Sequence, residues 1–334
     1  MLRKNILSQR RFRESFLQSR QGWVTIKKKP TTTAKERRNS MKNMGMDTYC
    51  YLCYLNRNVE IARTLGDEAT ATAFAKRLME LYLSAPEHAT SPWFGPHVAD
   101  LFYEFYGITE EDRYRQEKAE SNAFVLQRMD AVRDAIFQAE DPVYAGLQWA
   151  ILGNYIDFSA LRGEVSFQAL DTMMEKASQI QVDRHIYRQL QEEFEKGRRL
   201  LYLCDNAGEI GFDRLFAEAI AQKYPHLQII FCVRGGAALN DATREDAKAV
   251  GIPFPVIDNG TRIAGTQIEL LGAEAKNALD TADVILSKGQ GNVETMLGCG
   301  YNVYYAFLIK CQRFIDLFGK EKFTPMLFRE RSKQ

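Results

Sequence analysis

Three segments of the chain place carboxylates, amides or a lysine directly after short apolar runs. The first segment reads Leu-Leu-Tyr-Leu-Cys-Asp-Asn-Ala-Gly-Glu, and its polar part contains Asp205, Asn206 and Glu209. We predict a buried strand followed by a glycine turn and a helix, so that these oxygens lie at the carboxyl end of the strand. Such oxygens suit a divalent cation, and the start of a helix suits a phosphate. Asp205 is equally well explained as a cap of the following helix.

The second segment follows another apolar run and contains Arg234, Asn240 and Asp241 ahead of a second helix start. Thr243 and Asp246 have the spacing of a capping box, although aspartate is shorter than the usual Glu or Gln. Thr243 therefore has a structural explanation. Asp241, taken alone, is also explained as a solvated residue before the helix.

The third segment places Lys288 between the apolar run 283–287 and a glycine-rich turn that leads to Asn292 and Glu294. The spacing is neither that of a Walker loop nor that of the dinucleotide-binding glycine fingerprint. A lysine at a strand end, flanked by glycines, is well placed to neutralise a phosphoryl oxygen. The alternative is a surface lysine that simply follows a strand.

The elements that must position these segments change character near residue 197. From about residue 49 to 158, and again over 166–197, apolar residues recur at helical spacing with proline and glycine breaks. After residue 197, apolar runs at 200–204, 227–233, 254–257, 283–287 and 302–309 alternate with helical stretches. This alternation predicts an α/β fold, a three-layer α/β/α arrangement around a mostly parallel sheet, with an N-terminal helical subdomain. Ligands of such sheets bind at the carboxyl ends of the strands, where the polar segments lie.

We divide the chain into a basic extension (1–45), a helical subdomain (46–197) and an α/β domain that binds metal and phosphate (198–334). Residues 1–45 carry thirteen Lys and Arg against Glu14 and Glu36, a net charge of +11. We interpret them as an upstream extension before a start at Met41, Met44 or Met46, which implies a cytoplasmic protein. A mitochondrial presequence and a basic arm for nucleic acid are the alternatives.

Composition excludes several functional classes. The whole chain carries +1, so residues 46–334 carry −10, which argues against nucleic acid as a partner. No run approaches the roughly 18 apolar residues of a membrane helix, so we expect no membrane partner. The six cysteines are scattered, which favours reduced thiols. The four histidines lie outside the three segments, which disfavours a zinc site built from histidine. The oligomeric state is not indicated.

Taken together, the three segments resemble the damage-control metal-dependent phosphatase family, long called domain of unknown function 89. The resemblance lies in Asp205-Asn206-x-x-Glu209, Asn240-Asp241-x-Thr243 and Lys288-Gly-x-Gly-Asn292-x-Glu294, in this order after three strands.

Further segments extend the likeness over about residues 46–318. Gly-Asn-Tyr-Ile-Asp-Phe at 153–158 is similar to the family's Gly-Asn-x-Ile-Asp-Phe, and Lys310-Cys311 is similar to its Lys-Cys. Tyr114, Lys118 and Asn122 match a spaced Tyr, Lys, Asn triplet, although Asp112-Arg113 stands where Asp-Pro is usual. Cys50 and Cys53 resemble a pair found in the mainly prokaryotic branch.

The resemblance implies a metal-dependent phosphatase that hydrolyses small phosphometabolites, such as sugar phosphates or damaged metabolites, by metal-activated water. It implies that Asp205, Asn206 and Asp241 hold a divalent ion and that Lys288 contacts the phosphate. Oxygen ligands favour Mn, Ni or Co, and Mg also fits. The residues expected to line the substrate cleft are Asn154, Asp157, Glu209, Arg234, Asn240 and Asn292.

Three other mechanisms or functions remain as alternatives. Asp205 as a covalent nucleophile would need a second Asp two residues later, where Ala207 stands. A carboxyl methyltransferase that uses S-adenosylmethionine usually has a glycine-rich loop where this chain has Asp-Asn. A non-catalytic phosphosugar-binding protein would use Lys288 and Arg234 as anion contacts. We favour the phosphatase, with a small phosphate ester as its partner.

Overall fold

A computed structural model describes residues 44–155 and 177–330. Within these residues, six strands form one sheet in the order β3-β2-β1-β4-β5-β6. The first five strands are mutually parallel, and β6 is antiparallel to β5. Their bounds are β1 (Arg199–Leu203), β2 (Gln228–Val233), β3 (Val256–Asp258), β4 (Val284–Lys288), β5 (Val303–Leu308) and β6 (Pro325–Glu330).

The five strands expected from the sequence are confirmed within two residues at each end. The sixth, β6, was not predicted. It begins with Pro325, which has no N–H to donate to a ladder, and it lies at the edge of the sheet, where a proline is tolerated. A proline at the start of an otherwise mixed segment hides an edge strand from pattern reading.

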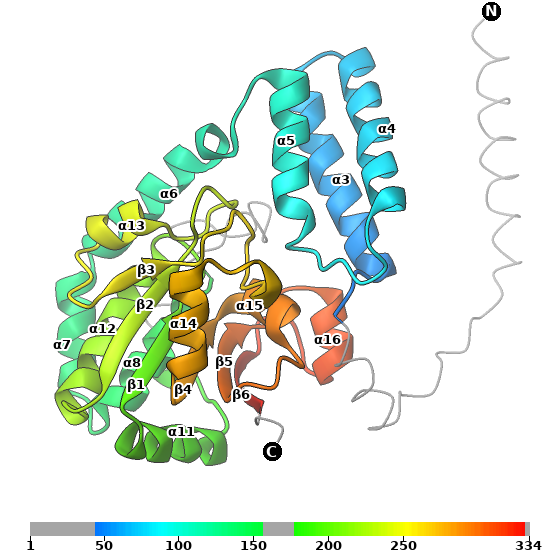
Figure 1. Cartoon of the computed structure of the whole chain (residues 1–334). Helices are drawn as coiled ribbons and strands as arrows, with labels where there is room; N and C mark the ends of the chain where they lie inside the picture. The colour runs from blue at the N-terminus through cyan, green and yellow to red at the C-terminus, as the bar shows by residue number, and fades with distance from the viewer. Residues whose placement is uncertain (1–43, 156–176, 331–334) are drawn as a thin grey trace, which may run out of the picture. The chain divides into compact units, whose positions relative to one another are not determined.

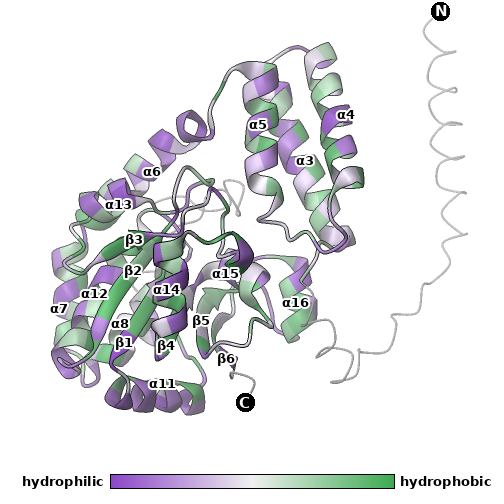
Figure 2. Cartoon of the chain, in the orientation of Figure 1, coloured by the Kyte–Doolittle hydropathy of each residue, from purple (hydrophilic) through white to green (hydrophobic). Residues whose placement is uncertain are grey.

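Helices cover both faces of the sheet, so the three-layer α/β/α prediction is confirmed (Figure 1). Along β1, Leu200 and Tyr202 face one layer, while Leu201 and Leu203 face the other. The first layer contains α8 (Pro142–Gly153), α11 (Arg184–Lys196) and α12 (Glu209–Lys223). The second contains α14 (Ala273–Thr281), α15 (Gly289–Met296) and α16 (Gln312–Phe318). Figure 2 shows the same division, with apolar strands inside and polar residues along α11.

The N-terminal helices α3 (Thr48–Leu65), α4 (Glu68–Ser84) and α5 (Phe94–Tyr106) form a bundle with its own core (Figure 1). Phe74, Phe94 and Phe102 are fully buried there, and burying such a ring contributes about 1.5–3 kcal/mol. Asp47 and Asp67 cap α3 and α4 through their side chains. Gly107, with φ 67°, ends α5 in the left-handed region.

Two further helices connect the bundle to the sheet layers. They are α6 (Glu110–Leu126) and α7 (Met129–Phe137). Val125 and Val132 pack with Phe212 and Leu215 of α12. The helical and α/β segments therefore share a hydrophobic core, and the predicted boundary at residue 197 stays a prediction. The remaining elements are α13 (Arg244–Ala249) and two short 3-10 helices, Ala177–Gln179 and Ile268–Leu270.

The chain reverses its direction of winding between β1 and β4. β1 pairs with β2 on one side and with β4 on the other, and Leu203 is in register with both Cys232 and Ser287. The three strands therefore end at the same level. The helix after β1 lies on one face and the helix after β4 on the other, which opens a crevice at their carboxyl ends. All three predicted segments start at this edge.

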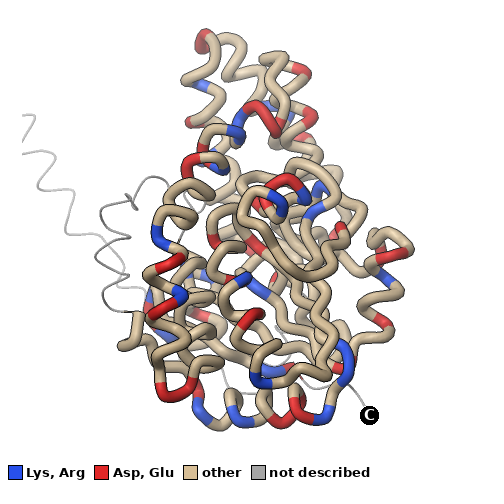
Figure 3. The backbone as a smooth tube through the Cα atoms, turned by 90° about the vertical axis from the view of Figure 1, so that its left-hand side faces the viewer, with Lys and Arg blue, Asp and Glu red and all other residues tan. Residues whose placement is uncertain are grey.

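Charge and hydropathy add two observations on the described chain. Figure 3 shows acidic and basic residues interspersed along the backbone. Among the residues that the structure describes, the helices are too short or too polar to cross a lipid bilayer.

Candidate functional site

The loops after β1 and β2 are joined to each other by backbone hydrogen bonds. Asn206 and Asp241 form an antiparallel bridge, and the N–H of Ala242 donates to the carbonyl of Asp205 over 2.7 Å. The two loops come from neighbouring parallel strands, so their first residues already lie close together. The bridge brings the three predicted metal ligands, Asp205, Asn206 and Asp241, to one place beside the crevice at the carboxyl ends of the strands.

A buried arginine lies behind the two carboxylates. Arg234 Nε donates to Asp241 Oδ2 over 2.6 Å, and its Nη2 lies 3.8 Å from Asp205 Oδ1. Arg234, Asp241 and Asp205 are only 2%, 4% and 6% exposed. Burial by itself lowers the pKa of Arg234, but the two aspartates raise it above its usual value. One cation therefore compensates part of the charge of two buried carboxylates and fixes the orientation of Asp241.

Two amide side chains orient Asp205. Asn154 and Asn206 each donate through Nδ2 to Asp205 Oδ2, both over 2.9 Å, and each also donates to Glu209 Oε2. The carbonyl oxygen of Asn206 is therefore turned away from these two carboxylates. Asn154 Oδ1 accepts from the N–H of Leu308 on β5, which anchors that amide to the sheet. Asn154 and Glu209 are fully buried, and their hydrogen bonds hold the side chains of Asp205 and Asn206 in place.

Lys288 lies in the interior, which differs from the expected contact with phosphate. Its ammonium donates to Glu209 Oε1 at 2.7 Å, Asp213 Oδ1 at 2.6 Å and the carbonyl of Ala150 at 2.8 Å. The side chain is 0% exposed. A direct contact with phosphate would require the ammonium to give up one of these three bonds. Lys288 instead fixes the position of Glu209, and Glu209 in turn fixes the side chain of Asn206.

The direction of the Lys288 side chain follows from strand alternation. Val284 and Leu286 of β4 face the layer that contains α8 and α12. Residue 288 has the same parity, so its side chain enters that layer and not the crevice. The carboxylates of Glu209 and Asp213, on the first turns of α12, are its partners there.

A cavity of about 150 Å³, which we call the ligand cavity, borders this hydrogen-bond network. Asp205, Asn206, Asn240 and Asp241 line it as predicted. Four charged or aromatic residues that were not predicted as site residues also line it: Tyr54 and Arg57 of α3, Glu294 of α15, and Lys310 after β5. Lys310 follows a predicted strand and Glu294 lies in the third polar segment, so the sequence pattern could have indicated both as site residues. Tyr54 and Arg57 lie within a helical pattern that gives no hint of a site.

Other predicted site residues lie around the ligand cavity without lining it. Asn292 is fully buried and donates to the carbonyls of Lys288 at 2.7 Å and Cys204 at 3.1 Å, which ties α15 to β1. Arg234 borders a neighbouring cavity. Asp157 lies outside the described residues. Substrate contacts by these residues remain predictions.

Comparison with known proteins identifies the family. Residues 46–324 match the damage-control phosphatase ARMT1-like domain. The chain belongs to the damage-control phosphatase family. This confirms the resemblance stated above, while the mainly prokaryotic branch, inferred from Cys50 and Cys53, stays a prediction.

Relatives and a solved structure agree with this assignment. An uncharacterized protein of Methanocaldococcus jannaschii is 30% identical over 285 residues, covering 81% of this chain and 90% of that protein. A damage-control phosphatase of Pyrococcus horikoshii is 32% identical over 259 residues, covering 76% and 86%. The crystal structure of a DUF89 family protein from Pyrococcus horikoshii superposes with a TM-score of 0.73 and 26% identity, covering 86% of this chain and 99% of that chain. Membership of the damage-control phosphatase family supports a phosphatase activity.

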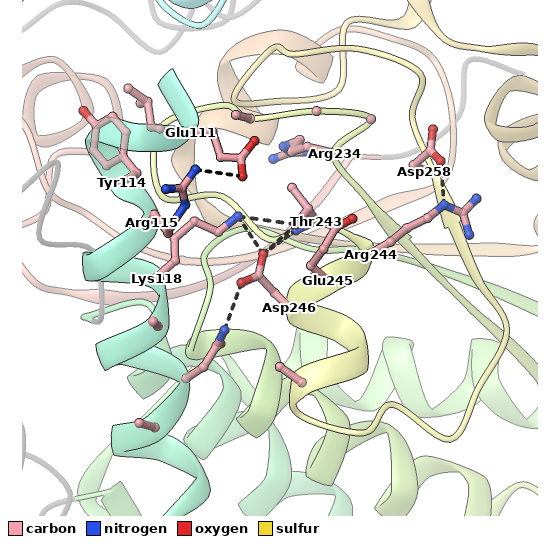
Figure 4. A pocket seen from close by; sticks show the side chains of 18 of the residues that line it. Glu111, Tyr114, Arg115, Lys118, Arg234, Thr243, Arg244, Glu245, Asp246 and Asp258 are labelled. Carbon is pink, nitrogen blue, oxygen red and sulfur yellow. Dashed lines mark hydrogen bonds and ion pairs between the residues drawn. The ribbon is translucent and has the colours of Figure 1, made fainter. Parts of the chain in front are cut away.

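The Tyr, Lys, Asn triplet that resembles the family pattern lies along one face of α6. Asn122 accepts from the N–H of Gly208 at 2.7 Å and donates to Asp246, and Lys118 pairs with Asp246 at 2.7 Å. Asp246 closes the predicted capping box with Thr243. Figure 4 shows Lys118 and Asp246 meeting between α6 and α13, beside a cavity of about 650 Å³ that Arg234 also borders. Lys118 and Asn122 thus fix the loops that begin α12 and α13, whereas Tyr114 accepts a hydrogen bond from Arg57 of α3 over 2.8 Å.

The candidate ligand set of this family member fits a hard divalent cation. It consists of two carboxylates and one amide, and the amide nitrogen is already used toward Asp205 and Glu209, so its oxygen is the atom left for a cation. Across residues 44–155 and 177–330, no group of three or more His, Cys, Asp or Glu is placed to hold a metal. The candidate centre therefore depends on Asn206 to complete it.

Gly289 allows Asp205 to approach α15 closely, and this gives a prediction. A Cβ at residue 289 would lie 1.9 Å from Asp205 Oδ2, and the residue has φ +76°. We expect Gly289→Ala to displace Asp205 and lower phosphatase activity by at least about a hundredfold, the usual loss for one preorganised contact. The measurement is phosphate release by folded variants.

Gly300→Ala is the matched control, because Gly300 has φ +84° but no neighbouring atom within 4 Å of the added Cβ. It should cost about 1–2 kcal/mol of stability through backbone strain alone, with normal turnover. Equal activity of the two variants would show that the position of Asp205 is not limiting.

Proposed function

We propose that this chain is a metal-dependent phosphatase for small phosphate esters, with a divalent ion held by Asp205, Asn206 and Asp241. The observation that carries the proposal is the backbone bridge between Asn206 and Asp241, which brings oxygen ligands of two loops to one cavity. Relatives named damage-control phosphatases support the same reaction class.

Different residues around the ligand cavity have different roles in the proposed reaction. A bound divalent ion would supply Lewis acidity and orient the phosphoryl group. Arg57 and Lys310 line the cavity and offset the charge that develops on the phosphoryl oxygens. Lys288 and Glu209 hold Asn206 in its orientation from the buried side. We assign Lys310, and not Lys288, as the lysine that faces the phosphate.

The size and polarity of the ligand cavity support a small substrate. A volume of about 150 Å³, lined by both acidic and basic groups, suits a phosphoryl group with part of a small polar alcohol. We therefore propose sugar phosphates or similar phosphorylated metabolites as the substrate class, with Mn, Ni, Co or Mg as the ion.

Phosphate release from a sugar phosphate and from p-nitrophenyl phosphate, with Mn²⁺ present, tests the proposal. We expect release from both esters. Methyl transfer from S-adenosylmethionine without phosphate release would favour the methyltransferase alternative. Saturable binding of a sugar phosphate without its hydrolysis would favour a binding protein.

A further inference from the structure

Glu294 is a carboxyl group of the ligand cavity that has no assigned role. It lies on α15 and lines the same cavity as the three candidate metal ligands. The residue as a whole is part-exposed, but its Oε2 is shielded from solvent and has no hydrogen-bond partner among the described residues. A buried carboxylate oxygen without a donor is unfavourable, because no hydrogen bond replaces its lost hydration.

The surroundings of Glu294 make its protonated form available near neutral pH. Burial raises the pKa of Glu294 to about 7, Arg313 opposes this rise, and Asp47 adds to it. The charged neighbours with the largest effect on this pKa therefore lie on α16 and at the cap of α3, and they are not the candidate metal ligands. The titratable and charged groups on the elements packed around Glu294 are Asp47, Cys50, Tyr54, Arg57, Lys310, Cys311 and Arg313, with Asp205 and Asp241 across the cavity.

A protonated carboxyl group is a hydrogen-bond donor. Glu294 lines the cavity in which the phosphate ester would lie, and because its Oε2 is shielded, the carboxyl oxygen that borders this space is Oε1. An acceptor supplied by the substrate would complete this hydrogen bond. In an ester of phosphate, the bridging oxygen is the atom that gains basicity as the reaction proceeds.

We propose that Glu294 donates the proton to the leaving-group oxygen of the phosphate ester. The inference rests on the proposed function. In the step, the bond between phosphorus and the bridging oxygen breaks, its electron pair stays on that oxygen, and the oxygen takes the Glu294 proton to leave as an alcohol. Water supplies hydroxyl to phosphorus and releases its second proton to solvent. The Glu294 carboxylate then recovers a proton from solvent.

This role predicts a dependence on the leaving group. An alkoxide, as formed from a sugar phosphate, is a strong base and needs a proton to leave. The p-nitrophenolate anion is stable near neutral pH and leaves without one. General acid catalysis typically contributes about 10²–10⁴-fold. Glu294→Gln keeps the size and a hydrogen-bond donor but has no proton to transfer.

We therefore expect Glu294→Gln to lower kcat for a sugar phosphate by about 10²–10⁴-fold and kcat for p-nitrophenyl phosphate by less than about tenfold. Glu274→Gln, on exposed α14 surface, is the control and should match the wild type on both esters. Equal losses on the two esters, or a raised KM with unchanged kcat, would overturn the acid role.

A second measurement uses only the wild-type protein and does not depend on how the variant folds. Because the acid works in its protonated form, kcat for the sugar phosphate should fall as pH rises through about 7, whereas kcat for p-nitrophenyl phosphate should not show this fall. Parallel pH profiles would overturn the inference while leaving the phosphatase proposal intact. Absence of phosphate release from both esters would instead overturn the proposed function.

Discussion

Lys288→Met is expected to lower the free energy of unfolding by about 3–5 kcal/mol, the usual loss when one partner of a buried ion pair is removed. The ammonium is shared by Glu209 and Asp213, and all three side chains are 0% exposed. Without it, two carboxylates would remain buried with no cation beside them. Methionine keeps most of the volume, so the loss reports the charge and not a cavity.

Lys276→Met is the matched control for this variant. Lys276 also pairs with a carboxylate at 2.5 Å, but it and Asp280 are 40% and 45% exposed. Solvent screens such a pair, so the unfolding midpoint should hardly move. The measurement is urea unfolding followed by circular dichroism for both variants. Equal midpoints would show that the buried network around Lys288 does not stabilise the fold.

The order of strands and helices could be predicted because it depends on local patterns. Apolar runs of four to eight residues alternate with helical stretches, and that alternation predicts parallel strands whose carboxyl ends meet at one edge. The sequence therefore placed Asp205, Asn206 and Asp241 at the same edge of the sheet. Edge strand β6 escaped because Pro325 begins it and its pattern is mixed.

The direction of single side chains was harder to predict. Lys288 was expected at the phosphate, although its parity with Val284 and Leu286 indicates the buried layer. Its burial depends on the acids of α12, which lie 75 and 79 residues away in sequence. Tyr54 and Arg57 reach the ligand cavity only through the packing of the bundle, which no local pattern encodes.

The second large effect expected is the loss of phosphatase activity on removal of metal. Asp205 and Asp241 share one cavity, and Arg234 between them compensates only part of their charge, so their oxygens favour a bound cation. Chelation should therefore abolish turnover, and Mn²⁺, Co²⁺ or Ni²⁺ should restore it. Asp241→Asn keeps the size and an acceptor for Arg234 but removes one charge. We expect it to lower kcat/KM by about 10²–10³-fold at saturating metal.

Asp258→Asn is the matched control for Asp241→Asn. Asp258 also ends a strand, β3, but it pairs with Arg244 on a more exposed surface, and the ligand cavity does not include it. Its variant should keep the turnover and metal requirement of the wild type. A loss similar to that of Asp241→Asn would indicate a general effect of charge at this edge of the sheet.

Phosphate release from p-nitrophenyl phosphate by the chelated wild-type protein, before and after addition of Mn²⁺, tests the central claim most directly. A parallel Mn²⁺ titration by calorimetry reports binding without turnover. The account predicts no release before addition, recovery after it, and clearly weaker Mn²⁺ binding by Asp241→Asn. Full phosphate release after exhaustive chelation, or equal Mn²⁺ binding by wild type and Asp241→Asn, would contradict a metal centre on Asp205, Asn206 and Asp241.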